Sequence, residues 1–454
     1  MSKTVSALAG LILFLFVASA SLQAKVSPEE AAALGGELTP VGAIRAGNQE
    51  GTIPAWTGGI TGPPEGYKAG GAYPNPYPDD QVLFTITAEN MGQYADRLSD
   101  GQKAMFERYP ATWKMQVYPT RRSAAWPKRI YDAVVRNAVT AELAEGGNGV
   151  LNASEGIPFP IPREGVETIW NHLLRYRGES IHRVYAQIPV TAAGAYTPVI
   201  VEEKILLPYA RAGATIESIN NISVYFLQSI KAPARLAGEM LLVHDTLNQV
   251  KEPRSAWTYN PGQRRVRRAP NVAHDNPGTG SDGLRTSDQL DMFNGAPDRY
   301  NWTLKGRKEF FVPYNAYQLG AAELKYADIL RPGHMNPELL RYELHRVWVT
   351  EANVKEGTRH VYARRVFYLD EDSWSVLESD QYDSRGRIWR VSMAHPINFY
   401  DQPFTGPLAE AHYDLQNGRY LVVGLTNETA SWQFNIQYDF EDFTPAALRR
   451  GGRR

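Results

Sequence analysis

The segment Trp257–Pro270 reads WTYNPGQRRVRRAP and predicts a β-hairpin. Its centre, Asn260–Gln263, has proline at the second position and glycine at the third, which fits a type II turn. The residues on either side of such a turn pair as antiparallel strands, whose successive side chains alternate between two faces. The alternation predicts Arg265 and Arg267 on one face and the other members of the run on the opposite face, namely Arg264, Val266 and Arg268.

Segments in which apolar residues recur at every second position continue along the chain and predict a large antiparallel sheet. Short turns such as NPGQ and DSRG separate many of them, which favours hairpins over parallel crossovers. Because strand twist accumulates, an open sheet of this size curls. The predicted strands are 181–190, 198–208, 219–230, 239–245, 254–259, 263–269, 342–350, 360–369, 373–379, 387–394, 418–426 and 432–438.

The predicted fold class is mainly β with α (α+β). A strongly curved sheet or incomplete barrel, with helices packed on or plugging one side, would bury the apolar faces of both kinds of element. The concave face of that sheet is a candidate cavity. Helices are expected where apolar residues recur with helical spacing or capping signals occur, in 27–35, twice within 87–109, and in 127–144, 164–177 and 316–329.

An irregular arm precedes this body. Between Gly47 and Asp80, fourteen of thirty-four residues are Gly or Pro, so regular structure is excluded. Four aromatic residues, Trp56, Tyr67, Tyr73 and Tyr77, argue against a free linker. We therefore expect residues 25–86 to lie over the body, either as a moving cover or as a static brace.

The N-terminus predicts export. Lys3 precedes the short apolar run Leu8–Val17, and small residues at Ala20 and Ala24 offer cleavage positions, so residues 1–24 are interpreted as a signal peptide. The chain contains no cysteine, which excludes disulfides, thiolate metal sites and a lipid-modified cysteine. The mature protein is therefore expected outside the cytoplasm and is not a lipoprotein. Residues 441–454 form a predicted basic C-terminal tail.

The four arginines of the hairpin, Arg264, Arg265, Arg267 and Arg268, allow two interpretations. They form either an ion-paired, solvated ribbon that protects a sheet edge, with acids such as Asp282, Asp288 and Asp291 as partners, or a docking patch for lipid headgroups or an acidic partner. Nucleic acid is not expected, because Lys and Arg total 48 against 49 Asp and Glu.

Catalytic and metal-binding motifs are missing from the sequence. There is no HExxH and no GxSxG, and the GTG at Gly278–Gly280 fits neither nucleotide-binding pattern. His244–Asp245 and His274–Asp275 are neighbours that would point to opposite faces of a strand. The acidic tip LDEDSW, around Asp370–Asp372, could bind calcium but is interpreted as a solvated turn. We therefore predict no catalytic residue, no metal and no cofactor.

Apolar residues of the predicted strands are candidates for the lining of a cavity. Core packing against the helices would select the same residue types, so composition does not separate the two roles. The candidate residues for an apolar cavity are Val224, Phe226, Trp257, Tyr259, Trp348, Val361, Phe367 and Val423.

Several segments together resemble a bacterial domain-of-unknown-function family that is related to the outer-membrane lipoprotein-sorting proteins LolA and LolB. They are TPVGAIRAGNQEGTIPAWTGG (39–59), YNPGQRRVRRAP (259–270), SDGLRTSDQLDMFNGAPDRYNWTLKGRKEFFVPYNAYQL (281–319), RYELHRVWVTEANVKEGTRHVYARRVFYLDEDSW (341–374) and DFTPAALRR (442–450). The resemblance implies a LolA-like half-open barrel over residues 87–440, with helices covering its mouth. It also implies a periplasmic relay for a lipophilic molecule near an RND/MMPL-type transporter and an outer-membrane protein. The chain is more than twice as long as LolA, and no ligand-contacting residue carries over.

The expected function is thus a periplasmic carrier of a lipid or other hydrophobic molecule. Two alternatives remain open at this point. One is an enzyme that modifies an envelope lipid or glycan with carboxylates such as Glu202 and Glu203, and the other is a scaffold for an outer-membrane partner.

Overall fold

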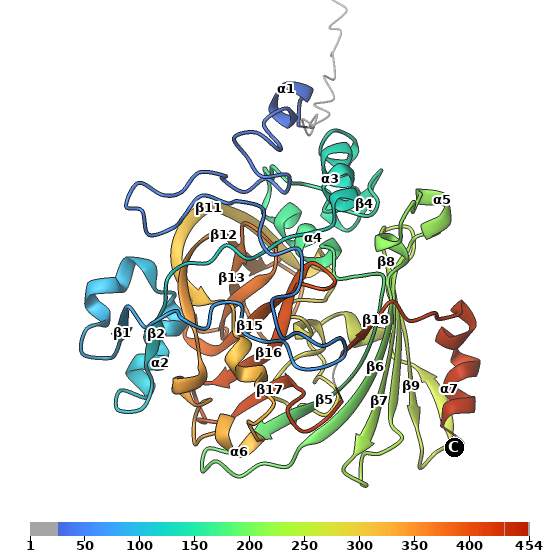
Figure 1. Cartoon of the computed structure of the whole chain (residues 1–454). Coiled ribbons are helices and arrows are strands. Elements are labelled where there is room, and N and C mark those ends of the chain that lie inside the picture. The colour runs from blue at the N-terminus through green and yellow to red at the C-terminus, as the bar shows by residue number, and fades with distance from the viewer. Residues whose placement is uncertain (1–25, 431, 453–454) are drawn as a thin grey trace, which may run out of the picture.

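The computed structural model describes residues 26–430 and 432–452 (Figure 1). The predicted signal peptide, residues 1–24, lies outside the described residues. Among the described helices, none has the length and apolar content that would be needed to cross a bilayer.

One sheet of 16 strands dominates the described chain. Its strands are β1 (Phe84–Ile86), β2 (Met115–Val117), β5 (Ser180–Val190), β6 (Val199–Leu206), β7 (Ile222–Ala232), β8 (Met240–Thr246), β9 (Ser255–Asn260), β10 (Arg265–Arg268), β11 (Tyr300–Pro313), β12 (Tyr342–Val354), β13 (Arg364–Asp370), β14 (Val376–Tyr382), β15 (Ile388–Phe399), β16 (Phe404–Asp414), β17 (Tyr420–Leu425) and β18 (Gln433–Phe434). A separate two-stranded sheet pairs β3 (Glu142–Leu143) with β4 (Val150–Leu151).

The large sheet consists of two antiparallel meanders joined edge to edge. Strands β5 to β10 form one meander and β11 to β17 the other, and the pairing of β17 with β5 joins them. The path runs from β1 through β2 and β12–β17 to β5–β10, with β11 paired to β12 and β18 to β5. The two end strands do not meet, so the sheet is curved but open, as Figure 1 shows. The predicted α+β class with a large curved antiparallel sheet is confirmed.

The helices of the described residues are few and short. They are α1 (Pro28–Ala31), α2 (Asp100–Arg108), α3 (Lys128–Thr140), α4 (Gly165–Leu174), α5 (Ile216–Ile219), α6 (Tyr326–Ile329) and α7 (Pro445–Gly451), with 3₁₀ turns that include η1 (Met91–Arg97), η7 (Tyr317–Gly320) and η9 (Phe440–Phe443). At the start of α1, within the range 27–35 where a helix is predicted, Ser27 and Glu30 form a capping box. The long helix predicted over 316–329 is wrong: the chain makes only η7 and α6 there, because Gly320 disfavours a helix interior.

Two long strands escaped prediction. In β11 a register shift between Leu304 and Gly306 interrupts the alternation that would have identified it. In β16 the dipeptide Gly406–Pro407 argues against a strand, because proline cannot donate a ladder hydrogen bond. The strand forms nevertheless, since Pro407 lies opposite Pro396 of β15, next to a register shift.

The hairpin β9–β10 forms, but with a different turn. Four residues, Pro261–Arg264, connect the strands, and Arg265 pairs with Asn260. The positive φ, 51°, falls at Arg264 and not at Gly262. The predicted type II turn is therefore wrong, because the Asn260 side chain accepts a hydrogen bond from the Gln263 backbone N–H (3.1 Å) and draws a longer loop together.

The C-terminal segment is a packed element and not the predicted tail. Thr444 caps α7 by accepting a hydrogen bond from the Ala447 backbone N–H (3.1 Å). Phe443 and Leu448 are buried against Leu242 and Tyr259 of the large sheet. Apolar burial thus fixes the segment to what we call the outer face of β8 and β9 (Figure 1).

The arm lies over the second meander. From residue 32 to residue 83 it contains no helix or strand beyond isolated bridges. Tyr67 and Tyr73 both donate hydrogen bonds to Asp401 (2.8 and 2.9 Å), and Trp56 donates to the Ala124 carbonyl (3.2 Å). Aromatic side chains therefore anchor the arm.

A buried carboxyl pair on β14 packs against the start of α2. Asp380 accepts hydrogen bonds from the Gly101 backbone N–H (3.1 Å) and the Tyr368 hydroxyl (3.1 Å), and Glu378 accepts one from Gln102 (2.7 Å). Burial raises the pKa of Asp380 to about 7 and holds that of Glu378 well above its usual range.

This pair gives a pH-dependent prediction for Asp380→Asn. An acid whose folded-state pKa exceeds its unfolded value destabilises the fold progressively as pH rises from about 4 to about 7. The isosteric variant lacks this loss, so its stability relative to the wild type should improve by on the order of 2 kcal/mol between pH 5 and pH 8. Urea unfolding at both pH values measures it. Titrating groups that do not contact Asp380 cancel because both proteins carry them, whereas Glu378, whose pKa the Asp380 charge also raises, adds to the effect in the same direction. The exposed Asp96→Asn is the control, and an equal pH response in both variants would contradict the assignment.

Candidate ligand-binding cavity

A cavity of about 290 Å³ lies between the sheet and the long loop that follows β10. Strands β5 to β9 supply one wall through what we call the inner face of the sheet, opposite the outer face that carries α7. The loop of residues 269–294 supplies the cover, and Phe404–Glu410 of β16 and Trp432 close one side. Its volume is at the lower end of the roughly 300–1,000 Å³ of small-molecule sites.

The wall on β6–β8 is apolar. Alternation brings Ile205, Val224, Phe226, Leu241 and Val243 to the inner face, where they pack together and border the cavity. On the cover, three apolar side chains face them: Ala269, Val272 and Leu290. An apolar molecule in this space would be removed from water on both sides.

The opposite end of the cavity is charged. Arg183 of β5 donates from Nε to Glu203 of β6 (2.7 Å). Glu203 is fully buried and also accepts hydrogen bonds from the Tyr185 hydroxyl (2.6 Å) and the Gln228 side chain (3.0 Å). The guanidinium of Arg183 stacks on Tyr185 and on Trp432, 4.6 Å from each ring centre.

Buried ion pairs hold the cover in place. Asp288 pairs with Arg365 of β13 (2.8 Å) and His360 (3.0 Å). Asp291 pairs with Arg175 (2.5 Å) and Arg177, both just after α4. These arginines hold the pKa of each aspartate well below its usual range although burial opposes this.

A second cavity of about 240 Å³ adjoins the first. The arm lines it with Gly70–Tyr73, the body lines it with residues such as Phe399 and Leu408, and Trp432 borders both cavities. The arm therefore covers this second space, whereas the loop 269–294 covers the first.

Only two of the eight predicted cavity residues border the first cavity, Val224 and Phe226. Trp257 and Tyr259 lie on the outer face under α7, because they alternate with Thr258, which does border the cavity. Val361 precedes β13 and is 42% exposed.

The other three predicted residues are packed into the core elsewhere. Trp348 stacks on Trp374 (6.0 Å between ring centres), and Phe367 contacts Phe293 and Trp302. Val423 packs in the cluster around Tyr185 and Leu284. Alternation alone could not separate these positions from the cavity wall, because both kinds of position are apolar.

The four arginines of the hairpin are exposed on the free edge strand and its turn. The acids predicted as partners are occupied elsewhere: Asp282 pairs with Arg419, and Asp288 and Asp291 have the partners given above. Among the ion pairs of the described chain, none includes Arg264, Arg265, Arg267 or Arg268. The predicted ion pairs of the ribbon with these acids are thus wrong, because other arginines of the body, including the partly exposed Arg419, bind them. Its solvated position at a sheet edge is as predicted.

Neighbouring titratable residues do not form a catalytic group. Glu202 and Glu203 point to opposite faces of β6, where Glu202 pairs with Lys231 (2.6 Å) and His182 (3.0 Å). His244 contacts the Phe443 carbonyl (2.7 Å) on the outer face, while Asp245 pairs with Arg254 on the inner face.

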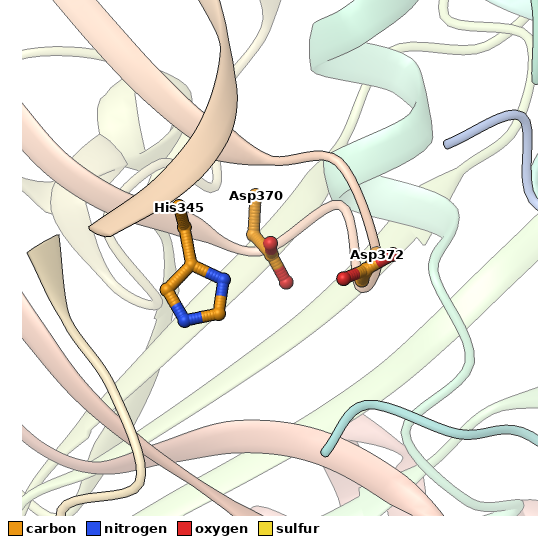
Figure 2. A group of neighbouring side chains, drawn as sticks. All are labelled: His345, Asp370 and Asp372. Carbon is orange, nitrogen blue, oxygen red and sulfur yellow. The ribbon is translucent and has the colours of Figure 1, made fainter. Parts of the chain in front are cut away.

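Three buried residues, His345, Asp370 and Asp372, bring potential ligand atoms within 4.8 Å of one another (Figure 2). Asp370 lies between the other two in this view. Both oxygens of Asp372 accept from Arg122 (2.7 and 2.8 Å), so a guanidinium already occupies the cationic position. The tip that was interpreted as solvated is in fact buried, because arm residues and Arg122 cover it. We interpret it as a structural charge network.

Sequence reasoning missed the polar residues of the cavity, Arg177, Arg183, Arg285 and Glu410. The sequence does contain a signal for Arg183. In IHRVYAQIPV it lies two residues from Ile181 and from Tyr185, so all three side chains point to the same face of the strand. A charge in the register of an apolar face indicates a buried polar site. Arg285 and Glu410 lie in segments for which no strand was predicted.

Fold and site together define a protein built on one large open sheet, with a loop-covered cavity that is apolar at one end and charged at the other. Residues 85–449 match the family DUF1329, which is described as a protein of unknown function, and the chain belongs to this family. The uncharacterized protein PA3922 of Pseudomonas aeruginosa is 50% identical over 444 residues, which are 98% of each chain.

Three solved structures are similar at low sequence identity. A domain from Vibrio parahaemolyticus named for outer membrane lipoprotein sorting has a TM-score of 0.42 and 16% identity. A DUF1329 family protein from Desulfovibrio piger has a TM-score of 0.40 and 13% identity, and a LolA superfamily protein from Nitrosomonas europaea 0.35 and 13%. In each comparison the match covers 60% of this chain and 92% of the other.

Proposed function

We propose that this protein binds a water-insoluble molecule in the cavity under the loop 269–294 and carries it through the periplasm. The observation that supports the proposal is the apolar wall of Val224, Phe226, Leu241 and Val243, which faces apolar side chains of the cover across about 290 Å³ of space. Each Å² of apolar ligand surface buried there gains about 25 cal/mol.

The route we propose for the cargo is between an inner-membrane RND/MMPL-type transporter and an outer-membrane protein. The predicted signal peptide and the resemblance of the sequence segments to the LolA-related family support this route. The proposed contact with a partner or with lipid headgroups consists of four exposed arginines that make no ion pair with the described residues, Arg264, Arg265, Arg267 and Arg268, since exposed guanidinium groups bind carboxylates and phosphates.

Mass spectrometry of bound material tests the carrier. Delipidated protein is incubated with an envelope extract, re-isolated and extracted. A carrier retains an unmodified lipophilic molecule at about one per chain. Release of an altered product would indicate an enzyme instead, and recovery of neither would contradict the carrier function.

A cavity-filling variant localises the binding. Val224→Trp places an indole in the cavity, and we expect it to weaken binding of the neutral apolar fluorophore N-phenyl-1-naphthylamine by about tenfold or more, equivalent to about 1.4 kcal/mol. Fluorescence titration measures the dissociation constant. Val361→Trp makes the same change at an exposed position and should leave the affinity unchanged. Equal affinities of both variants and the wild type would place the fluorophore elsewhere.

A further inference from the structure

The charged end of the cavity holds more arginine than carboxylate. Two arginines there have carboxylate partners of their own: Arg183 pairs with Glu203 (2.7 Å), and Arg254 pairs with Asp245. Each of these pairs is neutral as a unit, so they contribute no net charge.

The next arginines are not balanced in this way. Arg175 and Arg177 share the single carboxylate of Asp291. Burial lowers the pKa of Arg177 to about 10, so it remains charged at neutral pH. The two arginines and the one aspartate together leave one positive charge uncompensated beside the cavity.

Arg285 of the cover has no carboxylate partner among the described residues. It is 3% exposed, and its guanidinium donates only to neutral oxygens, the Gln187 side chain (3.1 Å) and the Thr286 carbonyl (3.4 Å). Its Nε has no hydrogen-bond partner within the part of the chain that the structure describes. Buried charges in proteins are normally paired, because removal from water costs several kcal/mol otherwise. An unpaired arginine that borders a cavity therefore points to a ligand of opposite charge.

Glu410 is the remaining carboxyl group that borders the cavity, and it does not supply the missing charge in full. It is buried, makes no ion pair with Arg285, and accepts a hydrogen bond from the Met292 backbone N–H (3.1 Å). Burial and the nearby Asp291 raise the pKa of Glu410 to about 7, so it is partly protonated at neutral pH. The adjacent His412 stays neutral because burial holds its pKa well below the usual range.

We infer that the cavity takes an amphiphile with one anionic headgroup, a carboxylate or a phosphate, held by Arg285 and Arg183. The terminal nitrogens of Arg183 make no hydrogen bond within the described chain, and both arginines border the same space. The tail would then lie along Val224, Phe226 and Val243. This inference rests on the proposed function and adds the class of cargo to it.

Competition among ligands with the same twelve-carbon tail tests the inference. The bound N-phenyl-1-naphthylamine is displaced at pH 7 by dodecanoate, dodecyl phosphate, dodecanol or dodecyltrimethylammonium, with inorganic phosphate as the headgroup alone. We expect dodecanoate or dodecyl phosphate to compete about tenfold better than dodecanol, and the better of the two identifies the headgroup. Inorganic phosphate should not displace the fluorophore, because it lacks the tail.

Variants then assign the preference to Arg285. Arg285→Gln should lower the ratio of the affinity for the anion to the affinity for dodecanol toward the value that Arg183 alone supports, whereas Arg285→Lys should retain more of the preference. Arg385→Gln removes an exposed arginine in the β14–β15 turn and is the matched control. The wild-type series decides the question even if Arg285→Gln fails to fold. Equal competition by dodecanol and the anions would overturn this inference and leave the carrier function standing, whereas failure to bind the fluorophore at all would remove the carrier function itself.

Discussion

Replacing Arg122 by methionine is expected to lower the free energy of unfolding by about 3–5 kcal/mol. The Arg122 side chain is almost fully buried and binds both oxygens of Asp372 (2.7 and 2.8 Å). It also donates to the backbone carbonyls of Arg45 (3.2 Å) and Pro54 (3.3 Å) in the arm. Methionine fills the space but leaves the Asp372 carboxylate buried without this partner, and it releases two anchor points of the arm.

Urea unfolding measures this loss, and the neighbouring residue supplies the control. Arg121 pairs with Asp80 (2.5 Å), but its side chain is 43% exposed, and Asp80 keeps a second partner in Arg341 (2.7 Å). Arg121→Met should therefore cost no more than about 1 kcal/mol. Similar losses in the two variants would contradict a structural role for the buried network. Faster tryptic cleavage at Arg45 in Arg122→Met alone would show that the arm has been released.

This network also marks a limit of prediction from sequence. The acidic tip Asp370–Asp372 has the composition of a solvated turn, and its spacing gives no sign of burial. The partners that bury it come from far along the chain: Arg122 lies about 250 residues earlier, and Ile44 donates its backbone N–H to Glu371 (3.1 Å). Long-range pairs of this kind are not encoded in local pattern, so a buried ion-pair cluster was interpreted as a surface turn.

The sheet itself was accessible because period-two alternation is a local signal. Strands such as β5 and β7 were predicted to within a few residues. β11 and β16 were missed where a register shift and a proline interrupt the pattern. Prediction of strands from alternation fails wherever the backbone departs from regular pleating. At such places tertiary packing, and not intrinsic propensity, determines whether a strand forms.

The position of the cavity could not be predicted from the same pattern. Alternation correctly grouped Val224 with Phe226 and Trp257 with Tyr259. It could not tell that the first pair borders the cavity while α7 covers the second, because both faces of β7–β9 carry apolar side chains that are buried or partly buried. Only the packing of residues 269–294 on one face and of α7 on the other distinguishes them.

The adjacent residues Glu202 and Glu203 give the second large effect, because the strand places them on opposite faces. Glu203→Gln should lower the free energy of unfolding by about 3 kcal/mol. Glu203 is fully buried and is the carboxylate partner of Arg183 (2.7 Å), so its neutral isostere leaves a buried guanidinium at the charged end of the cavity without a counter-ion. Glu202 is partly exposed and pairs with Lys231 and His182 at the surface, so Glu202→Gln should cost less than about 1 kcal/mol.

Urea unfolding of the two variants and of Glu203→Asp measures the difference. The shorter acid retains the charge and should lose less stability than the glutamine variant if the charge, and not the packing, is what Arg183 requires. Because an anionic ligand would replace the missing counter-ion, dodecanoate should stabilise Glu203→Gln more than it stabilises the wild type. Equal losses in Glu202→Gln and Glu203→Gln would mean that the inner face of β6 is as accessible to water as the outer face, and a loss in Glu203→Asp as large as in Glu203→Gln would assign the effect to geometry instead of charge.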